Sequence, residues 1–223
     1  MAARSARGCR ATLDPSELCH RGVSHILSLL ARVAVDLDQI GHPWALVGGL
    51  AVGARARPRF TQDIDLAVAV DSDHSAERVV AALRKRDYEL DTLLEQEQRG
   101  RIGTVRMLPP GAATNSLLVD LLFAACGVEV EIAAAAERMR LVRDLDLPVA
   151  RTGHLVAMKL LSHDQQRRPA DLDDLRVLVE ACDARELERA RTAVRAIVER
   201  GFHRGRDLEG DLDAWIQRRT AAP

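Results

Sequence analysis

The sequence has few aromatic residues, few cysteines and no long apolar run. Only 3% of its 223 residues are aromatic, so the core must consist mainly of Leu, Val, Ala and Ile. The four cysteines are scattered without metal-ligand spacing, which argues against a disulfide framework and a zinc site. No segment approaches the ~20 apolar residues of a membrane span, and the Arg-rich start lacks the apolar run of a secretory signal. We therefore expect a soluble, cytoplasmic protein that does not bind membranes.

An excess of charge is lacking as well. The chain has 32 Lys and Arg against 33 Asp and Glu, for a net charge of −1. This balance gives no global electrostatic reason to bind nucleic acid or a membrane surface. Arginines do cluster locally, as in Arg55, Arg57 and Arg59. Such clusters are consistent with a basic patch beside one cleft or with solvated surface arginines.

The pattern of apolar residues predicts a mixed α/β part followed by an all-helical part. We predict a disordered N-terminus over residues 1–13, an α/β domain over 14–150 and a C-terminal helical domain over 151–223. Expected strands cover 44–47, 63–70, 102–108 and 116–123, and expected helices cover 14–40, 49–56, 72–86, 129–140, 152–166, 171–181, 184–200 and 207–219. The stretch after Tyr88 is polar and shows no clear element, and short extended pieces are expected near residues 141 and 149.

One pair of carboxylates differs from the others. Asp-x-Asp occurs six times in the chain, so the tripeptide alone means little. Only Asp63 and Asp65 lie within a β-branched and aliphatic strand, just after a Gly-Gly turn. The alternation of a strand places both of their side chains on one face.

Asp120 is a lone charge in the apolar segment 116–123, where an unpaired carboxylate is costly. It could form a salt bridge with an arginine, or it could bind a metal. If its strand neighbours that of Asp63 and Asp65, three carboxylates converge and favour a hard cation such as Mg²⁺. The pattern then suits a two-metal displacement at phosphorus, in which Asp63 and Asp65 bridge the metals. Asp120 would bind the metal on the nucleophile side and take the hydroxyl proton.

Gly48 and Gly49 predict a phosphate-binding turn. Glycine lets the backbone approach a phosphate closely, and the following helix directs free N–H groups at the anion. A glycine pair can also serve only as a turn. Arg59 and Thr61, just before the strand of Asp63, could contact phosphate or ribose, or could cap the loop.

Lys159 is the only lysine in the helical half and lies on an apolar helix. A compact ammonium on a flexible stem suits the β- and γ-phosphates of a nucleotide, although a surface lysine can also extend its charge to water. Arg168 and Asp171 follow in the chain. Asp171 is expected to cap the helix 171–181, and Asp171 or Asp174 could position Lys159 or Arg168.

These motifs together resemble the nucleotidyltransferase superfamily that includes DNA polymerase beta, in particular its AbiEii-type branch. The resemblance covers about residues 44–178 and rests on five segments: Gly48-Gly49, Arg59-Phe60-Thr61-x-Asp63-Ile64-Asp65-Leu66, Val119-Asp120-Leu121-Leu122, Lys159-Leu160 and Arg168-x-x-Asp171-x-x-Asp174-Leu175. The superfamily usually has Gly-Ser where this chain has Gly48-Gly49, which removes one hydroxyl from phosphate binding.

The resemblance implies a fold of the α/β (α+β) class, with a small mixed β-sheet flanked by helices and a C-terminal helical domain that closes the cleft. It implies NTP as the donor and Mg²⁺ as the cofactor, with Asp63, Asp65 and Asp120 as metal ligands. The nucleotide would be held by Gly48, Gly49, Arg59, Thr61, Lys159, Arg168 and Asp171. Relatives include toxins of type IV toxin–antitoxin systems, some of which add nucleotides to the 3′ end of tRNA. A tRNA acceptor and a cognate antitoxin are therefore expected partners.

The sequence does not identify the acceptor of the nucleotide. Nucleotidyl transfer to a small molecule such as an aminoglycoside, or to a protein side chain, is an alternative within the same enzyme class. A different class of function is a catalytically silent NTP-binding regulatory module. A basic cleft would favour tRNA, an acidic pocket would favour an aminoglycoside, and the near-neutral charge does not decide between them.

Overall fold

The computed structural model describes residues 15–59, 61–96, 99–111, 117–162 and 169–221. The segment 1–13, predicted to be disordered, lies outside the described residues, as does Arg168. The elements follow in the order α1 (Pro15–Ile40), β1 (Trp44–Val47), α2 (Gly48–Arg55), β2 (Asp63–Val68), α3 (Asp73–Arg84), β3 (Glu89–Gln96), β4 (Arg101–Leu108), β5 (Leu118–Leu122), α4 (Glu129–Ala134), β6 (Glu137–Val142), β7 (Leu145–Val149), α5 (Thr152–Ser162), α6 (Pro169–Ala181), α7 (Ala184–Glu199) and α8 (Leu208–Ala221).

The described strands form one mixed sheet in the order β3-β4-β5-β2-β1-β7-β6. β2 runs antiparallel to β1 and parallel to β5. α3, β3 and β4 separate β2 from β5 in the chain, yet the two strands are hydrogen-bonded neighbours at the centre of the sheet. The fold therefore brings together the two segments in which the sequence placed its unusual carboxylates.

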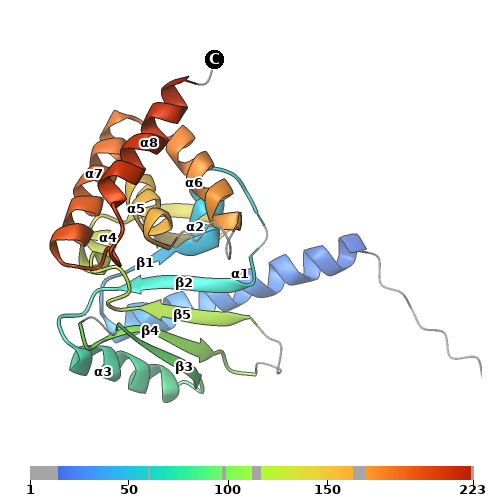
Figure 1. The fold of residues 1–223 in the computed structure, drawn as a ribbon. Coiled ribbons are helices and arrows are strands. Elements are labelled where there is room, and N and C mark those ends of the chain that lie inside the picture. The colour runs from blue at the N-terminus through green and yellow to red at the C-terminus, as the bar shows by residue number, and fades with distance from the viewer. Residues whose placement is uncertain (1–14, 60, 97–98, 112–116, 163–168, 222–223) are drawn as a thin grey trace, which may run out of the picture.

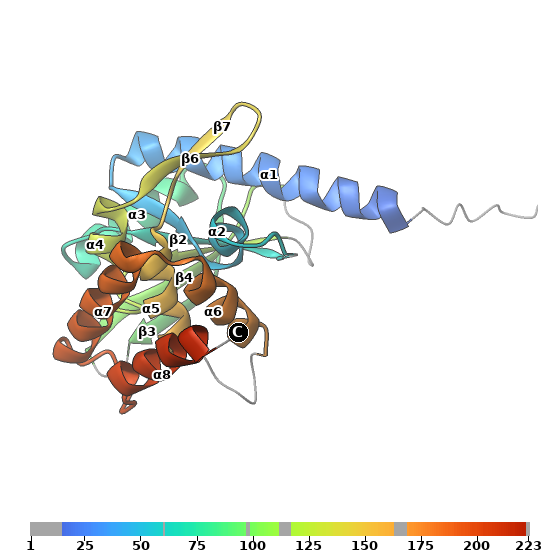
Figure 2. The same ribbon diagram turned by 90° about the horizontal axis from the view of Figure 1, so that it is seen from above.

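Helices cover both faces of the sheet. α1 and α3 lie on one face, and α2 and α5–α8 lie on the other (Figures 1 and 2). Apolar side chains that alternate along β2, such as Ile64 and Leu66, are fully buried because a sheet covered on both faces excludes water. One cluster of buried residues joins these strands to Leu155 and Leu160 of α5. The expected fold class, a mixed sheet flanked by helices with helices alone after residue 150, is confirmed.

Two segments of the α/β part differ from what the sequence predicts. The segment 129–140, expected as one helix, is divided between α4 and β6. Glu137 at the start of β6 forms ion pairs with Arg55 and Arg151 at 2.8 and 2.9 Å, and β6 pairs with β7. These tertiary contacts outweigh a weak local preference for helix.

The second difference concerns the polar stretch after Tyr88, for which the sequence predicted no element and which forms the edge strand β3. β3 pairs with β4 on one side only, and nearly all of its residues are exposed. An exposed edge strand has no buried face to impose alternation, so its sequence carries little of the signal on which strand prediction depends. No helix among the described residues is long and apolar enough to cross a membrane.

Candidate active site

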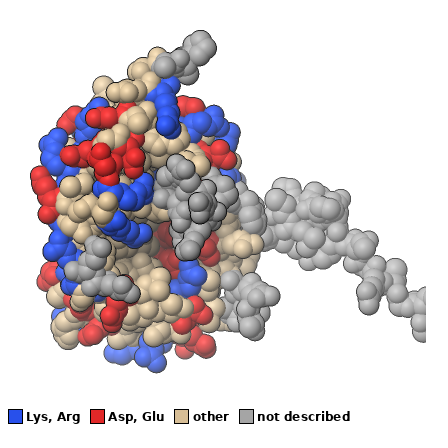
Figure 3. All heavy atoms as spheres, viewed as in Figure 1, with Lys and Arg blue, Asp and Glu red and all other residues tan. Residues whose placement is uncertain are grey.

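Three carboxylates meet where β2 lies beside β5. In the parallel register Asp65 is directly opposite Asp120, and Asp63 precedes Asp65 by two residues on the same strand face. Asp120 is only 7% exposed, and Asp63 and Asp65 are half-buried. Figure 3 shows acidic side chains at the centre of this face of the molecule, between the sheet and the helices. The convergence expected from the sequence is therefore present.

Gly48 makes room for Asp65. Val47, the last residue of β1, is opposite Asp65 on β2, so the chain turns into α2 directly beside that carboxylate. Gly48 has a φ of +62°, and a Cβ at this position would overlap the Asp65 carboxyl group. Both observations require glycine here, because it has no Cβ and adopts positive φ readily.

The Asp65 carboxylate is held in an electrostatically unfavourable position. Burial raises its pKa to about 6, with further contributions from the charges of Asp120 and Asp63. Lys159 and a hydrogen bond from the Gly49 backbone act in the opposite direction. Because the raising effects prevail, an additional positive charge at this place would be stabilising.

Arg106 is the cation that the structure places against Asp120. It lies opposite Asp120 across β4 and β5. Its Nε and Nη2 atoms donate to the two carboxylate oxygens at 2.8 and 2.7 Å. This bidentate pair is the salt-bridge alternative that the sequence left open for Asp120. The sequence did not identify Arg106 as the partner, and the only signal was its place on an alternating strand.

The carboxylates fit a divalent cation in part. Within the described part of the chain, no three His, Cys, Asp or Glu side chains are arranged as a metal site. Asp63 and Asp65 nevertheless supply hard oxygen ligands on one strand face, and the raised pKa of Asp65 shows an unmet demand for positive charge. Asp120 could join them only if Arg106 released at least one of its oxygens.

A second charged cluster lies on the helical side. Lys159 of α5 forms ion pairs with Asp171 at 2.7 Å and with Asp174 at 2.9 Å, both on α6. Its charge also acts on Asp65, so it lies near the sheet carboxylates. Asp171 is in the first turn of α6, which begins at Pro169, so the expectation that Asp171 is the helix cap is wrong. Its carboxylate instead binds Lys159 and accepts a hydrogen bond from Ser162 at 3.2 Å.

Arg59 connects the loop before β2 to the same cluster. Its Nε is 2.8 Å from Asp174 Oδ1. A Cβ on Gly49 would lie 2.7 Å from Arg59 Nη2 and 2.9 Å from Thr61 Oγ1, so Gly49 allows both side chains to pack against the start of α2. The Thr61 hydroxyl donates to the Asp63 carbonyl at 3.5 Å, which is the loop-capping alternative. The two expected nucleotide-binding residues thus lie next to the glycine turn.

The arrangement has the chemical parts needed for phosphate chemistry. Val47, which precedes α2, provides no side-chain cap. The Gly49 N–H donates to Asp65, and the N–H groups that follow it in the first turn of the helix can bind an anion. Gly48 faces the carboxylate of Asp65, Gly49 faces Arg59, and the charge of Lys159 acts on Asp65. Anionic phosphates and a cation could therefore bind side by side.

Comparison with known proteins identifies the family. The sequence profile described as "Nucleotidyl transferase AbiEii toxin, Type IV TA system" matches residues 28–222. The chain belongs to this family. The protein is therefore an AbiEii-type nucleotidyltransferase and a transferase enzyme, as expected from the resemblance. Its family membership supports nucleotidyl transfer in general, with NTP and a divalent metal as the usual requirements of such enzymes, and suggests an antitoxin partner.

A solved structure shows the same fold. The antibiotic-resistance factor ANT(2'')-Ia resembles this AbiEii-type chain with a TM-score of 0.53 at 15% identity, over 79% of this chain and 93% of that one. An antigenic nucleotidyltransferase-like protein from Paracoccidioides brasiliensis has a TM-score of 0.49 at 17% identity, over 85% of this chain and 91% of that one. A search of curated proteins found no match.

Proposed function

We propose that the protein transfers a nucleoside monophosphate from an NTP to an acceptor hydroxyl and releases pyrophosphate. The new bond joins the acceptor oxygen to the α-phosphorus, and the bond from that phosphorus to the pyrophosphate oxygen breaks. The observation that carries this proposal is the register that sets Asp65 opposite Asp120 beside the glycine turn at Gly48.

The sheet carboxylates supply the cation-binding side of the site. Asp63 and Asp65 would hold Mg²⁺, and Asp120 would complete the set once Arg106 releases it. When bound, Mg²⁺ neutralises charge on the phosphates and lowers the pKa of the acceptor hydroxyl. Asp120 would also accept the proton of that hydroxyl once Arg106 releases it.

The glycine turn at the start of α2, together with side chains of α5 and of the loop before β2, would bind the nucleotide. The N–H groups at the start of α2, behind Gly48 and Gly49, would bind phosphate oxygens. Lys159 would contact the β- and γ-phosphates, and Asp171 and Asp174 hold its ammonium group toward the sheet. Arg59 and Thr61 would contact phosphate or ribose, together with Arg168.

For the acceptor, we propose the 3′ end of tRNA, with a cognate antitoxin as the controlling partner. Support comes from the family description as a toxin of a type IV toxin–antitoxin system. A small-molecule acceptor and a protein side chain are the alternatives that the same chemistry allows.

The test is incubation with Mg²⁺ and each α-labelled NTP in turn, with total RNA, protein or a small-molecule extract as the acceptor. We expect label in the RNA fraction with the wild-type protein and none with Asp63→Ala/Asp65→Ala. Label in another fraction would contradict the tRNA proposal alone. Label in no fraction would contradict nucleotidyl transfer.

One contact bears directly on this reaction. Arg106 occupies both oxygens of Asp120, so Asp120 can bind a cation only after Arg106 releases it. Calorimetry with Mg²⁺ and NTP beside the turnover assay separates NTP binding from transfer. Binding of NTP without transfer to any acceptor would contradict the proposed reaction.

A further inference from the structure

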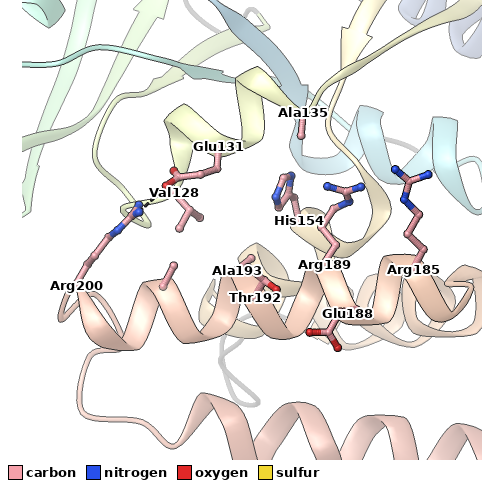
Figure 4. A pocket seen from close by; sticks show the side chains of 11 residues that line it. Val128, Glu131, Ala135, His154, Arg185, Glu188, Arg189, Thr192, Ala193 and Arg200 are labelled. Atoms are coloured by element: carbon pink, nitrogen blue, oxygen red, sulfur yellow. Dashed lines mark hydrogen bonds and ion pairs between the residues drawn. The ribbon is translucent and has the colours of Figure 1, made fainter.

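A cavity of about 490 Å³ lies between α4, α5 and α7. Its lining includes neither the sheet carboxylates nor Lys159, so it is separate from the candidate active site. The volume is within the range of small-ligand pockets. Figure 4 shows the space enclosed by side chains from all three helices.

One face of α7 forms the floor of this cavity. Arg185, Arg189, Ala193 and Ala196 line it and follow one another at spacings of three or four residues, which places them on the same side of a helix. Ala193 and Ala196 have small side chains, which leave a slot along this face of the helix. The guanidinium groups of Arg185 and Arg189 extend from α7 on the N-terminal side of Ala193 (Figure 4). Among the described residues Arg185 has no interaction partner, so it is free to bind an anion.

Two buried polar atoms in the lining have no hydrogen-bond partner in the described part of the chain. They are His154 Nδ1 on α5 and Glu131 Oε2 on α4, and His154 is only 6% exposed. The other oxygen of Glu131 accepts from Arg200. Burial lowers the pKa of His154 to about 4, so at neutral pH its ring is neutral and one nitrogen can donate. Unpartnered buried polar groups are costly, and a ligand that pairs with both would remove that cost.

We propose that this cavity binds a mononucleotide whose base carries an amino group beside a ring nitrogen, as adenine and cytosine do. The amino group donates to Glu131 Oε2, and the ring nitrogen accepts from His154 Nδ1–H. The flat base fills the slot over Ala193 and Ala196. The phosphate pairs with Arg185 and with the terminal nitrogens of Arg189, whose Nε already pairs with Glu186 at 3.3 Å. No residue of the active site takes part, so this proposal does not depend on the proposed reaction.

The test is calorimetric titration with AMP in the presence of EDTA, followed by photo-crosslinking with 8-azido-AMP and peptide mapping. We expect AMP to bind, the label to appear on peptides of α4, α5 or α7, and IMP, which lacks the amino group, to bind about tenfold or more weakly. Label confined to the segment around Gly48 and Asp65, equal affinity for IMP, or no binding would overturn the proposal.

Two variants with a matched control locate the site. Ala196→Leu fills the slot, and Arg185→Glu reverses the charge at its end. Each should weaken AMP binding by about tenfold or more. Arg195→Glu makes the same charge change at an exposed position of α7 outside the cavity lining and should leave the affinity unchanged. Equal affinities for AMP in Arg185→Glu and wild type would show that the phosphate does not bind at the end of the cavity lined by Arg185 and Arg189.

Discussion

The molecule contains two neighbouring pairs of aspartates with opposite electrostatic situations. Asp171 and Asp174 on α6 contact Lys159 and Arg59 at 2.7 to 2.9 Å. Asp63 and Asp65 on β2 repel one another, and burial with neighbouring charge raises the pKa of Asp65 to about 6. The negative charges of the helical pair, Asp171 and Asp174, are therefore compensated, and the pair can orient Lys159. In the sheet pair, Asp63 and Asp65, the raised pKa of Asp65 favours a nearby positive charge, as a cation site requires.

The largest effect is expected from Asp65→Asn. Activity should fall by about 10³-fold or more because a ligand for the cation is lost. In the absence of metal, Tm should rise by about 2–4 °C because a carboxylate whose pKa is raised in the fold destabilises it when ionised. The turnover assay and thermal unfolding in EDTA measure the two effects. Asp173→Asn, at an exposed position of α6, is the control and should change neither value.

Lys159→Met, which removes the cation of the helical pair, should destabilise the protein, whereas Asp65→Asn should stabilise it. It leaves Asp171 and Asp174 buried with one cation fewer, so we expect a loss of about 3–5 kcal/mol in the free energy of unfolding. Lys85→Met removes the other, exposed lysine and should cost less than about 0.5 kcal/mol. Urea denaturation compares the variants, and similar losses in both would show that Lys159 is an ordinary surface residue.

Gly48→Ala tests whether the sheet pair depends on the glycine turn. The new Cβ would displace the Asp65 carboxylate, so activity should fall by about 100-fold. Gly41→Ala has the same kind of backbone strain, with a φ of +85° and nothing within 4 Å of the new Cβ. It should lose about 1–2 kcal/mol of stability and keep its activity. If both variants retained activity, the close approach of Gly48 to Asp65 would have no functional role.

The pH dependence of cation binding should distinguish the pairs further. Because the pKa of Asp65 is raised to about 6, protons compete with a cation below this value. The affinity for Mn²⁺ should be constant above pH 7 and should fall by about tenfold for each pH unit below pH 6. Isothermal titration across pH 5–8 measures it. An affinity that stays constant down to pH 5 would place the cation elsewhere.

The sequence predicted the sheet pair better than the helical pair, for a physical reason. Burying a charge is costly, so a carboxylate within an apolar strand stands out in the sequence. The alternation of side chains along the strand then determines on which face of the sheet that carboxylate lies. The pairing of Lys159 with Asp171 depends on how α5 packs against α6, so the sequence could offer it only as an alternative beside a helix cap for Asp171. The Arg106–Asp120 pair depends on the register between β4 and β5, which no local signal fixes. The helix expected over 129–140 failed for a similar reason, since the partners of Glu137 are distant in the chain.

The most direct test of the account is Mn²⁺ binding followed by electron paramagnetic resonance, with NTP present, in wild type, Asp65→Asn and Asp171→Asn. We predict that Asp65→Asn abolishes binding of the ion and that Asp171→Asn leaves the affinity for the ion within about threefold of wild type. Equal binding in wild type and Asp65→Asn, or its loss only in Asp171→Asn, would contradict the assignment of the cation to the carboxylates of β2.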